Sequence, residues 1–243
     1  MKNMGHYLIE FRFHGYAKKY ARTVIYDVAR KFNVKGVTRK RAVPHITLYG
    51  PFTTRNERQV VSIVANIGRK YNLVPFKVKG FNHFNNWANK VIYLDIEPSN
   101  KLENFRWELS QALRPITNTV STFDKDKQFS FHSTIAFKDI NSKFSKIKEY
   151  IQSKEEPNIN QHLLRVTILR NGKILYEYDL IQKRLLNRRD ARSKFHWQKT
   201  IQQFKSMNVG TQDEIETEDD FEEENDDKSL WKKIKLLFGL NKK

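Results

Sequence analysis

Short apolar strands separated by amphipathic helices run through this chain, and the pattern occurs twice. In the first half it predicts strands over residues 7–13, 43–49, 73–84 and 90–96, and helices over 17–28, 60–67 and 102–113. In the second half it predicts a strand over 129–137, a helix over 144–151 and a hairpin over 163–180 that turns at Asn171 and Gly172. No repeat of roughly 20–50 residues is found, which argues against a solenoid. We therefore expect an α+β fold built from two similar halves.

The composition excludes several classes of protein. No apolar run approaches the ~20 residues that a membrane-spanning helix needs, and the N-terminal residues do not resemble a secretory signal. The chain has no cysteine, so disulfides and thiolate chemistry are excluded, and no motif among its seven histidines resembles a metal site. We expect a cytoplasmic protein that uses no metal and no cofactor.

Charge is distributed unevenly along the chain. Residues 213–227 hold eleven of the 27 acidic groups and residues 228–243 hold six of the 45 basic groups, so residues 1–212 carry 16 acidic against 39 basic groups. A cationic body of this kind favours a polyanionic partner, with RNA or nucleotides ahead of acidic membranes because aromatic residues are interspersed with the basic ones.

The chain beyond residue 182 divides into three segments. Residues 183–205 are expected to form a basic helix, broken near Ser193, with Arg184, Arg188 and Arg192 on one face that is either solvated or in contact with RNA. Residues 206–227 are expected to be a disordered acidic linker, with the alternative that their charge mimics a nucleic-acid backbone and competes for the cationic surface. Residues 228–243 are expected to form a basic amphipathic helix. Because a short isolated helix is only marginally stable in water, this helix is expected to dock on an anionic membrane, a partner protein or the rest of this chain.

Two His-x-Thr triplets lie inside predicted strands. Because side chains alternate along a strand, His45, Thr47 and Tyr49 are expected on one face, and His132 and Thr134 share a face of theirs. One neutral imidazole and one protonated imidazole suit general base and general acid roles at a phosphodiester, and two threonine hydroxyls suit its non-bridging oxygens. Tyr49 is expected either to stack on a base or to be a wall or core aromatic.

The two motifs, Pro44–Leu48 and Phe131–Ile135, resemble the signature motifs of the 2H phosphoesterase superfamily, in particular its 2′-5′ RNA ligase and RNA 2′,3′-cyclic phosphodiesterase branch. The resemblance covers residues 5–182 and defines a domain over 1–182. It implies a bilobal fold with two pseudo-symmetric lobes, mainly antiparallel sheets and a central cleft. By position, His45 and His132 are the implied catalytic pair, and Thr47 and Thr134 the implied phosphate ligands. Ser133 departs from the family, which usually has an apolar residue there.

The function expected from this resemblance is hydrolysis of a 2′,3′-cyclic phosphate on RNA or a small nucleotide, with reversible 2′-5′ RNA ligation as a further activity. The alternatives are a non-catalytic RNA-binding module and a hydrolase of a cyclic or 2′-5′ linked signalling nucleotide. The near-symmetric motifs do not distinguish the general base from the general acid, and nothing in the sequence indicates an oligomeric state.

Overall fold

The computed structural model describes residues 5–209 except 40, 86–89 and 120. The acidic segment 213–227 and the amphipathic segment 228–243 lie outside the described residues, as do residues 86–89 between the strands expected over 73–84 and 90–96. Within the described part of the chain, no helix has the length and apolar character needed to cross a bilayer.

The chain alternates strands and helices in an order close to the one expected. The strands are β1 (Gly5–Arg12), β2 (His45–Thr54), β3 (Pro75–Asn85), β4 (Lys90–Pro98), β5 (Asn118–Thr119), β6 (His132–Phe137), β7 (Asn158–His162), β8 (Arg165–Arg170), β9 (Lys173–Asp179) and β10 (Arg184–Asn187). The helices are α1 (Gly15–Phe32), α2 (Glu57–Lys70), α3 (Asn100–Leu113), α4 (Phe144–Gln152), α5 (Arg188–Ala191) and α6 (Lys194–Ser206).

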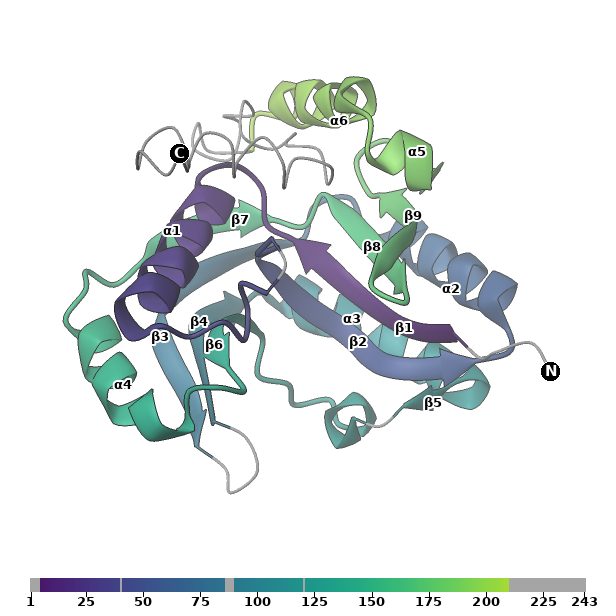
Figure 1. The fold of residues 1–243 in the computed structure, drawn as a ribbon. Coiled ribbons are helices and arrows are strands. Elements are labelled where there is room, and N and C mark those ends of the chain that lie inside the picture. Colours follow the sequence, from purple (N-terminus) through teal and green to yellow (C-terminus); the bar gives the residue numbers. More distant parts are fainter. Residues whose placement is uncertain (1–4, 40, 86–89, 120, 210–243) are drawn as a thin grey trace, which may run out of the picture.

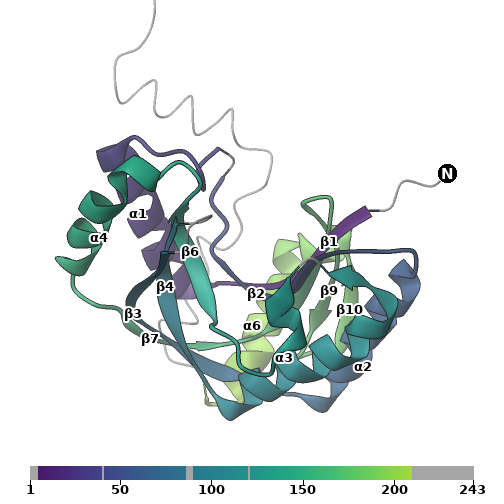
Figure 2. The same cartoon turned by 90° about the horizontal axis from the view of Figure 1, so that it is seen from below.

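Two antiparallel sheets form the two lobes. One has the strand order β10-β9-β8-β1-β2-β5, and the other has the order β6-β4-β3-β7. Helices α2 and α3 lie on the side of the six-stranded sheet, whereas α1 and α4 lie with the four-stranded sheet (Figures 1 and 2). Helix α1 therefore leaves the end of β1 and packs on the other lobe. The expected α+β, bilobal architecture is confirmed.

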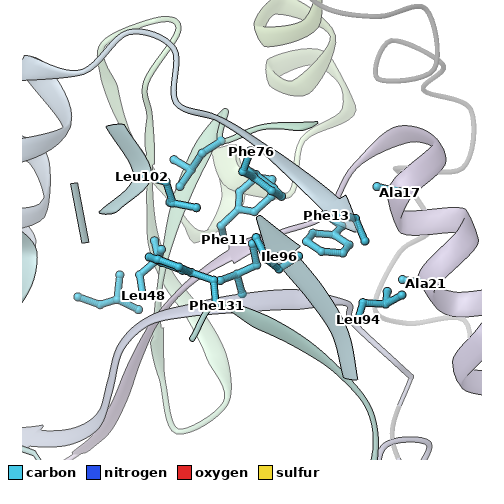
Figure 3. Packing of buried hydrophobic residues seen from close by; sticks show 14 of the residues in the cluster. Phe11, Phe13, Ala17, Ala21, Leu48, Phe76, Leu94, Ile96, Leu102 and Phe131 are labelled. Carbon is cyan, nitrogen blue, oxygen red and sulfur yellow. The ribbon is translucent and has the colours of Figure 1, made fainter. Parts of the chain in front are cut away.

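A continuous hydrophobic core joins the lobes. Phe11 of β1 contacts Phe76 of β3 edge to face, with ring centroids 5.5 Å apart. Leu48 and Phe131, which belong to the two triplet segments, lie in the same cluster (Figure 3). Each such side chain contributes about 1.5–3 kcal/mol when it is fully buried. The sheets are thus held at a fixed relative position, which matters because each carries one triplet.

Strand β2 is longer than the sequence suggested. The predicted strand ended at Tyr49, before Gly50 and Pro51, but β2 continues through both residues to Thr54. Gly50 has φ +104°, a conformation open to glycine, and its N–H donates to the carboxylate of Asp124 at 3.0 Å. The glycine therefore bends the strand and does not terminate it.

The prediction of a helix from residue 183 is wrong at its start. Residues 184–187 form β10, in which Leu186 is fully buried and pairs with Glu177 of β9. Asn187 then caps α5 by accepting hydrogen bonds from the N–H groups of Arg189 and Asp190. Pairing to a sheet overrides helical spacing here, so Arg184 does not share a helical face with Arg188 and Arg192. The expected break near Ser193 is confirmed, since Ser193 is the N-cap of α6.

The last described helix packs on the body. Ile201 and Phe204 of α6 are buried against Leu164 and Ile181. The segment after residue 182 therefore extends the six-stranded sheet and covers part of it.

Candidate active site

The two strands that carry the triplets meet at the junction of the sheets. Strand β6 is an edge strand of its sheet, and β5 pairs with β2 only at Phe52 and Thr53, away from the His45 end. The first half of β2 is therefore left to contact β6, and the two strands do lie against each other. The fold thus brings the two triplets, 87 residues apart in sequence, to one place.

The two histidines have matching hydrogen bonds. Each is the first residue of its strand and is half-buried. Nδ1 of His45 lies 2.8 Å from the carbonyl oxygen of Val43, and Nδ1 of His132 lies 2.9 Å from that of Ser130. Because a carbonyl oxygen only accepts, the proton of each neutral ring is on Nδ1. Nε2 is left as the atom that gains or loses a proton in each ring.

The threonines follow the alternation expected of a strand. Thr47 and Thr134 are half-buried like the histidines, whereas Ile46 and Ile135 beside them are buried in the core. Thr47 therefore shares a strand face with His45, and Thr134 shares one with His132.

Two charged side chains of β1 lie beside His45. In the antiparallel register, Arg12 pairs with His45 and Glu10 pairs with Thr47, so all four are on one face. Glu10 is only 2% exposed; its Oε1 accepts from Nε of Arg12 at 2.7 Å, and its Oε2 lies 3.8 Å from Nε2 of His45. Sequence reasoning missed Glu10 and Arg12. The sequence feature that could have identified them is the Glu-x-Arg pair of Glu10 and Arg12 inside a strand that is otherwise mostly apolar.

Aromatic rings surround His132. The ring centroids of Phe84 and Tyr93 lie 5.1 and 5.0 Å from the centroid of the imidazole. Burial lowers the pKa of His132 below its usual 6.5, and the charge of His45 acts in the same direction. The hydrogen bond that His132 donates to the carbonyl oxygen of Ser130 and the charge of Asp95 act in the opposite direction. The two imidazoles therefore have different surroundings: a carboxylate lies beside His45, and aromatic rings lie beside His132.

Tyr49 does not face this site. The expectation that it shares a face with Thr47 is wrong, because the pairing of β1 with β2 shifts between Ile9 and Glu10 and leaves Leu48 as an extra residue. Tyr49 is 0% exposed, and its hydroxyl lies 2.6 Å from Oγ1 of Thr117. A fully buried ring has no face on which a base can stack, so Tyr49 is a core aromatic.

Ser133 and His14 are both buried polar residues. Ser133 is 1% exposed, and its hydroxyl has no hydrogen-bond partner among the described residues. His14 is buried, with its Nε2 3.0 Å from the carbonyl oxygen of His162. No three His, Asp or Glu side chains of the described residues are grouped as a metal site would require.

Comparison with solved structures finds low-identity matches. LigT of E. coli complexed with 3′-AMP aligns with 69% of this chain and 88% of its own at 14% identity and a TM-score of 0.43. A structure described only as a phosphoesterase aligns with 76% and 94% at 11% identity and a TM-score of 0.45. Usb1 of Kluyveromyces marxianus with uridine monophosphate aligns with 76% and 98% at 11% identity and a TM-score of 0.43.

Comparison with sequence families gives the clearer result. No curated protein matches the chain significantly. The family model described as the 2′-5′ RNA ligase superfamily matches residues 22–173, a span that includes both triplets, the whole four-stranded sheet, and strands β2, β5 and β8 of the six-stranded sheet. This agrees with the resemblance of the two motifs to 2H phosphoesterases. The chain belongs to the 2′-5′ RNA ligase superfamily, whose members are phosphoesterase-like and ligase-like proteins.

Proposed function

We propose that the chain is a metal-independent phosphodiesterase that opens a 2′,3′-cyclic phosphate on RNA or a small nucleotide. The observation that carries this proposal is the matched pair of imidazoles on contacting strands, each with Nδ1 held by a carbonyl oxygen two residues upstream. That arrangement leaves two Nε2 atoms for one substrate. A base and an acid are what an in-line displacement at phosphorus requires.

The different surroundings of the two rings suggest their roles. His132 lies among aromatic rings that keep it neutral, so it is proposed as the general base that takes a proton from water. His45 has Oε2 of Glu10 3.8 Å from its Nε2, and the remaining role, that of the general acid, is proposed for it.

The proposed reaction is a single displacement. The water oxygen forms a bond to phosphorus as its proton passes to Nε2 of His132. The bond from phosphorus to one ribose oxygen breaks, and that oxygen takes the proton from Nε2 of His45. The hydroxyls of Thr47 and Thr134 donate to the non-bridging oxygens, whose charge persists through the transition state. The product is a phosphate monoester. With the 5′-hydroxyl of a second strand in place of water as the nucleophile, and the 3′ oxygen as the leaving group, the same groups suit 2′-5′ ligation.

A non-catalytic RNA-binding module is the principal alternative. It would use the cationic surface and would not depend on Nε2 of either histidine. The positions of Glu10 and Phe84, each beside a different imidazole, favour the enzyme because they prepare the two rings for opposite proton transfers. A hydrolase of a cyclic or 2′-5′ linked signalling nucleotide would use the same chemistry on a smaller substrate.

The test is turnover of a 2′,3′-cyclic nucleotide and of an oligonucleotide with a cyclic-phosphate end, both in EDTA. The informative variants are His45→Asn and His132→Asn, because the asparagine amide retains a donor near the position of Nδ1 and lacks Nε2. Each is expected to lose about 10²–10⁴ in kcat. His83→Ala is the matched control, since His83 lies on β3 against Phe144, with ring centroids 5.6 Å apart. Turnover that survives either asparagine variant, or that EDTA abolishes, would refute the proposal.

A further inference from the structure

A fully buried arginine lies on the helix that precedes the second triplet. Arg106 is 0% exposed and shares the core face of α3 with Leu102 and Leu109. Packing of the helix does not require a charge at this position, because an apolar side chain would fill the space without the cost of burying an ion. The contacts of the guanidinium therefore indicate its role.

The guanidinium of Arg106 holds the segment that joins α3 to β6. Its two terminal nitrogens donate to the carbonyl oxygens of Asp126 and of Phe123, the latter at 2.6 Å. Its central carbon lies over the ring of Phe129, 4.1 Å from the centroid. Residues 126–131 belong to no helix or strand, so these contacts replace the hydrogen bonds that a sheet would give the backbone. The planar fork of an arginine can reach two carbonyl groups and a ring at once, whereas the ammonium of a lysine cannot.

Asp124 ties the same segment to the strand of the first triplet. One oxygen of this buried carboxylate lies 3.5 Å from a terminal nitrogen of Arg106, and the other accepts from the N–H of Gly50 in β2 at 3.0 Å. The hydroxyl of Ser110 in α3 donates to the carbonyl oxygen of Asp124. The segment is therefore fixed between α3 and β2, the strand that carries His45.

The segment ends at the carbonyl group that orients His132. The rings of Phe129 and Phe131 have centroids 4.9 Å apart, and Phe131 is buried in the cluster that contains Leu48 (Figure 3). Ser130 lies between these two anchored residues, and its carbonyl oxygen is 2.9 Å from Nδ1 of His132. The hydrogen bond at one ring nitrogen sets the tautomer of an imidazole, and thereby whether the other nitrogen is able to accept a proton.

We infer that Arg106 is a positioning residue for the general base: with Asp124 it fixes the Ser130 carbonyl, which keeps the proton of His132 on Nδ1 and leaves Nε2 able to accept one. The inference rests on the proposed function, in which His132 takes a proton from water. Arg106 is inaccessible to a substrate, so its loss changes the state of the imidazole and not the charge around the reacting phosphate.

The test measures the tautomer of each histidine ring in the full chain, by two-bond proton–nitrogen NMR correlations with isotope-labelled histidine. Spectra are recorded at about pH 8.5, where an imidazole of ordinary pKa is neutral. The signals of His132 are assigned from their absence in His132→Asn. The same proteins give kcat and KM for a 2′,3′-cyclic mononucleotide in EDTA, and thermal unfolding verifies that each variant is folded.

Two variants remove the contacts of Arg106 in different ways. Arg106→Lys keeps a charge beside Asp124 and loses the fork and the contact with the Phe129 ring. Arg106→Met combined with Asp124→Asn leaves no buried charge at the pair, and the asparagine oxygen is still able to accept from Gly50. The matched control is Arg165→Lys, which alters another buried arginine, paired with Asp179 at 3.1 Å on β8 and β9.

In the wild type, the proton of neutral His132 is expected on Nδ1. In the Arg106 variants the ring should become a mixture of tautomers, while His45, whose carbonyl partner is Val43, stays unchanged. Their kcat should fall by about 10²-fold, the effect of misplacing a reacting group by about 1 Å, with KM nearly unchanged. Arg165→Lys should lose thermal stability and keep the wild-type tautomers and kcat.

Wild-type values of either the His132 tautomer or kcat in a folded Arg106 variant would overturn the inference, as would an equal fall of kcat in Arg165→Lys. If neither Arg106 variant folds, the same two measurements on Phe129→Leu decide, because this variant keeps both charges and removes the ring that the guanidinium contacts. Failure of the proposed function appears separately, as absence of turnover in the wild type, since the tautomer is measured without turnover.

Discussion

Replacing Arg165 by methionine is expected to loosen the C-terminal segment from the body. Arg165 is 5% exposed; its Nε donates to Asp179 at 3.1 Å, and one terminal nitrogen lies 3.5 Å from Glu177. Its other terminal nitrogen donates to the carbonyl oxygen of His196 at 2.8 Å and to Thr200. The guanidinium of Arg165 thus pairs with carboxylates of β9 and donates hydrogen bonds to acceptors of α6.

The magnitude follows from the burial of the partners. Asp179 is 0% exposed and Glu177 is 6% exposed, so the variant leaves two carboxylates with less compensation in a low-dielectric environment. Removing one partner of a buried ion pair costs about 3–5 kcal/mol in the free energy of unfolding. In a protein of this size each kcal/mol shifts Tm by about 2–4 °C, so Tm is expected to fall by about 6–20 °C.

The assay is thermal unfolding followed by circular dichroism. Arg184→Met is the matched control because Arg184 pairs with Asp190 at 3.4 Å on the surface, where an ion pair contributes about 0–1 kcal/mol. Adding Glu177→Gln and Asp179→Asn to Arg165→Met should recover much of the loss, since no buried charge then remains. A fall in Tm of less than about 2 °C, or no recovery in the triple variant, would refute the reasoning.

Four further predictions concern His132, Ser133 and the acidic segment 213–227. Burial lowers the pKa of His132, so the acidic limb of the pH profile of kcat/KM should lie below pH 6.5. Phe84→Ala exposes the imidazole of His132 to water and should move this limb to higher pH. A limb that does not move contradicts the proposed environment of His132. The lowered pKa of His132 also makes stability depend on pH, because the unfolded chain binds more protons than the folded chain near pH 6.5. The free energy of unfolding should therefore decrease as the pH falls through 6.5. Urea titrations of His132→Asn should show a weaker pH dependence. Ser133→Ala removes a buried hydroxyl that has no partner among the described residues and should raise the free energy of unfolding by about 1 kcal/mol without changing turnover; destabilisation would show that the hydroxyl is satisfied. If residues 213–227 compete for the cationic surface, deletion of 211–243 should increase RNA affinity at low salt, and unchanged affinity would end that hypothesis.

The parts of the site that follow from strand periodicity could be predicted from the sequence. His45 and Thr47, and likewise His132 and Thr134, share a face because alternate residues of a strand do so. The position of Tyr49 could not be predicted, because an extra residue at Leu48 is visible only when β1 is paired with β2. One irregular residue reverses which face the rest of a strand presents.

Features that depend on the pairing of distant segments also escaped prediction. Glu10 reaches His45 through a register that joins residues 35 positions apart, and Phe84 reaches His132 across the four-stranded sheet. Strand β10 was taken for helix because Arg184, Arg188 and Arg192 have helical spacing, whereas the pairing of β10 with β9 depends on the buried Leu186. The local pattern therefore located the groups proposed to react, and long-range packing determined their surroundings.

Measurement of kcat/KM for the wild type, His45→Asn, His132→Asn and the double variant tests most directly whether both imidazoles serve one phosphate. Groups that act as one catalytic unit are strongly non-additive, so the double variant is expected to be within about tenfold of the weaker single variant. If the two losses, each about 10²–10⁴, multiply in the double variant, or if one single variant keeps wild-type activity, the two histidines do not act together and the account is wrong.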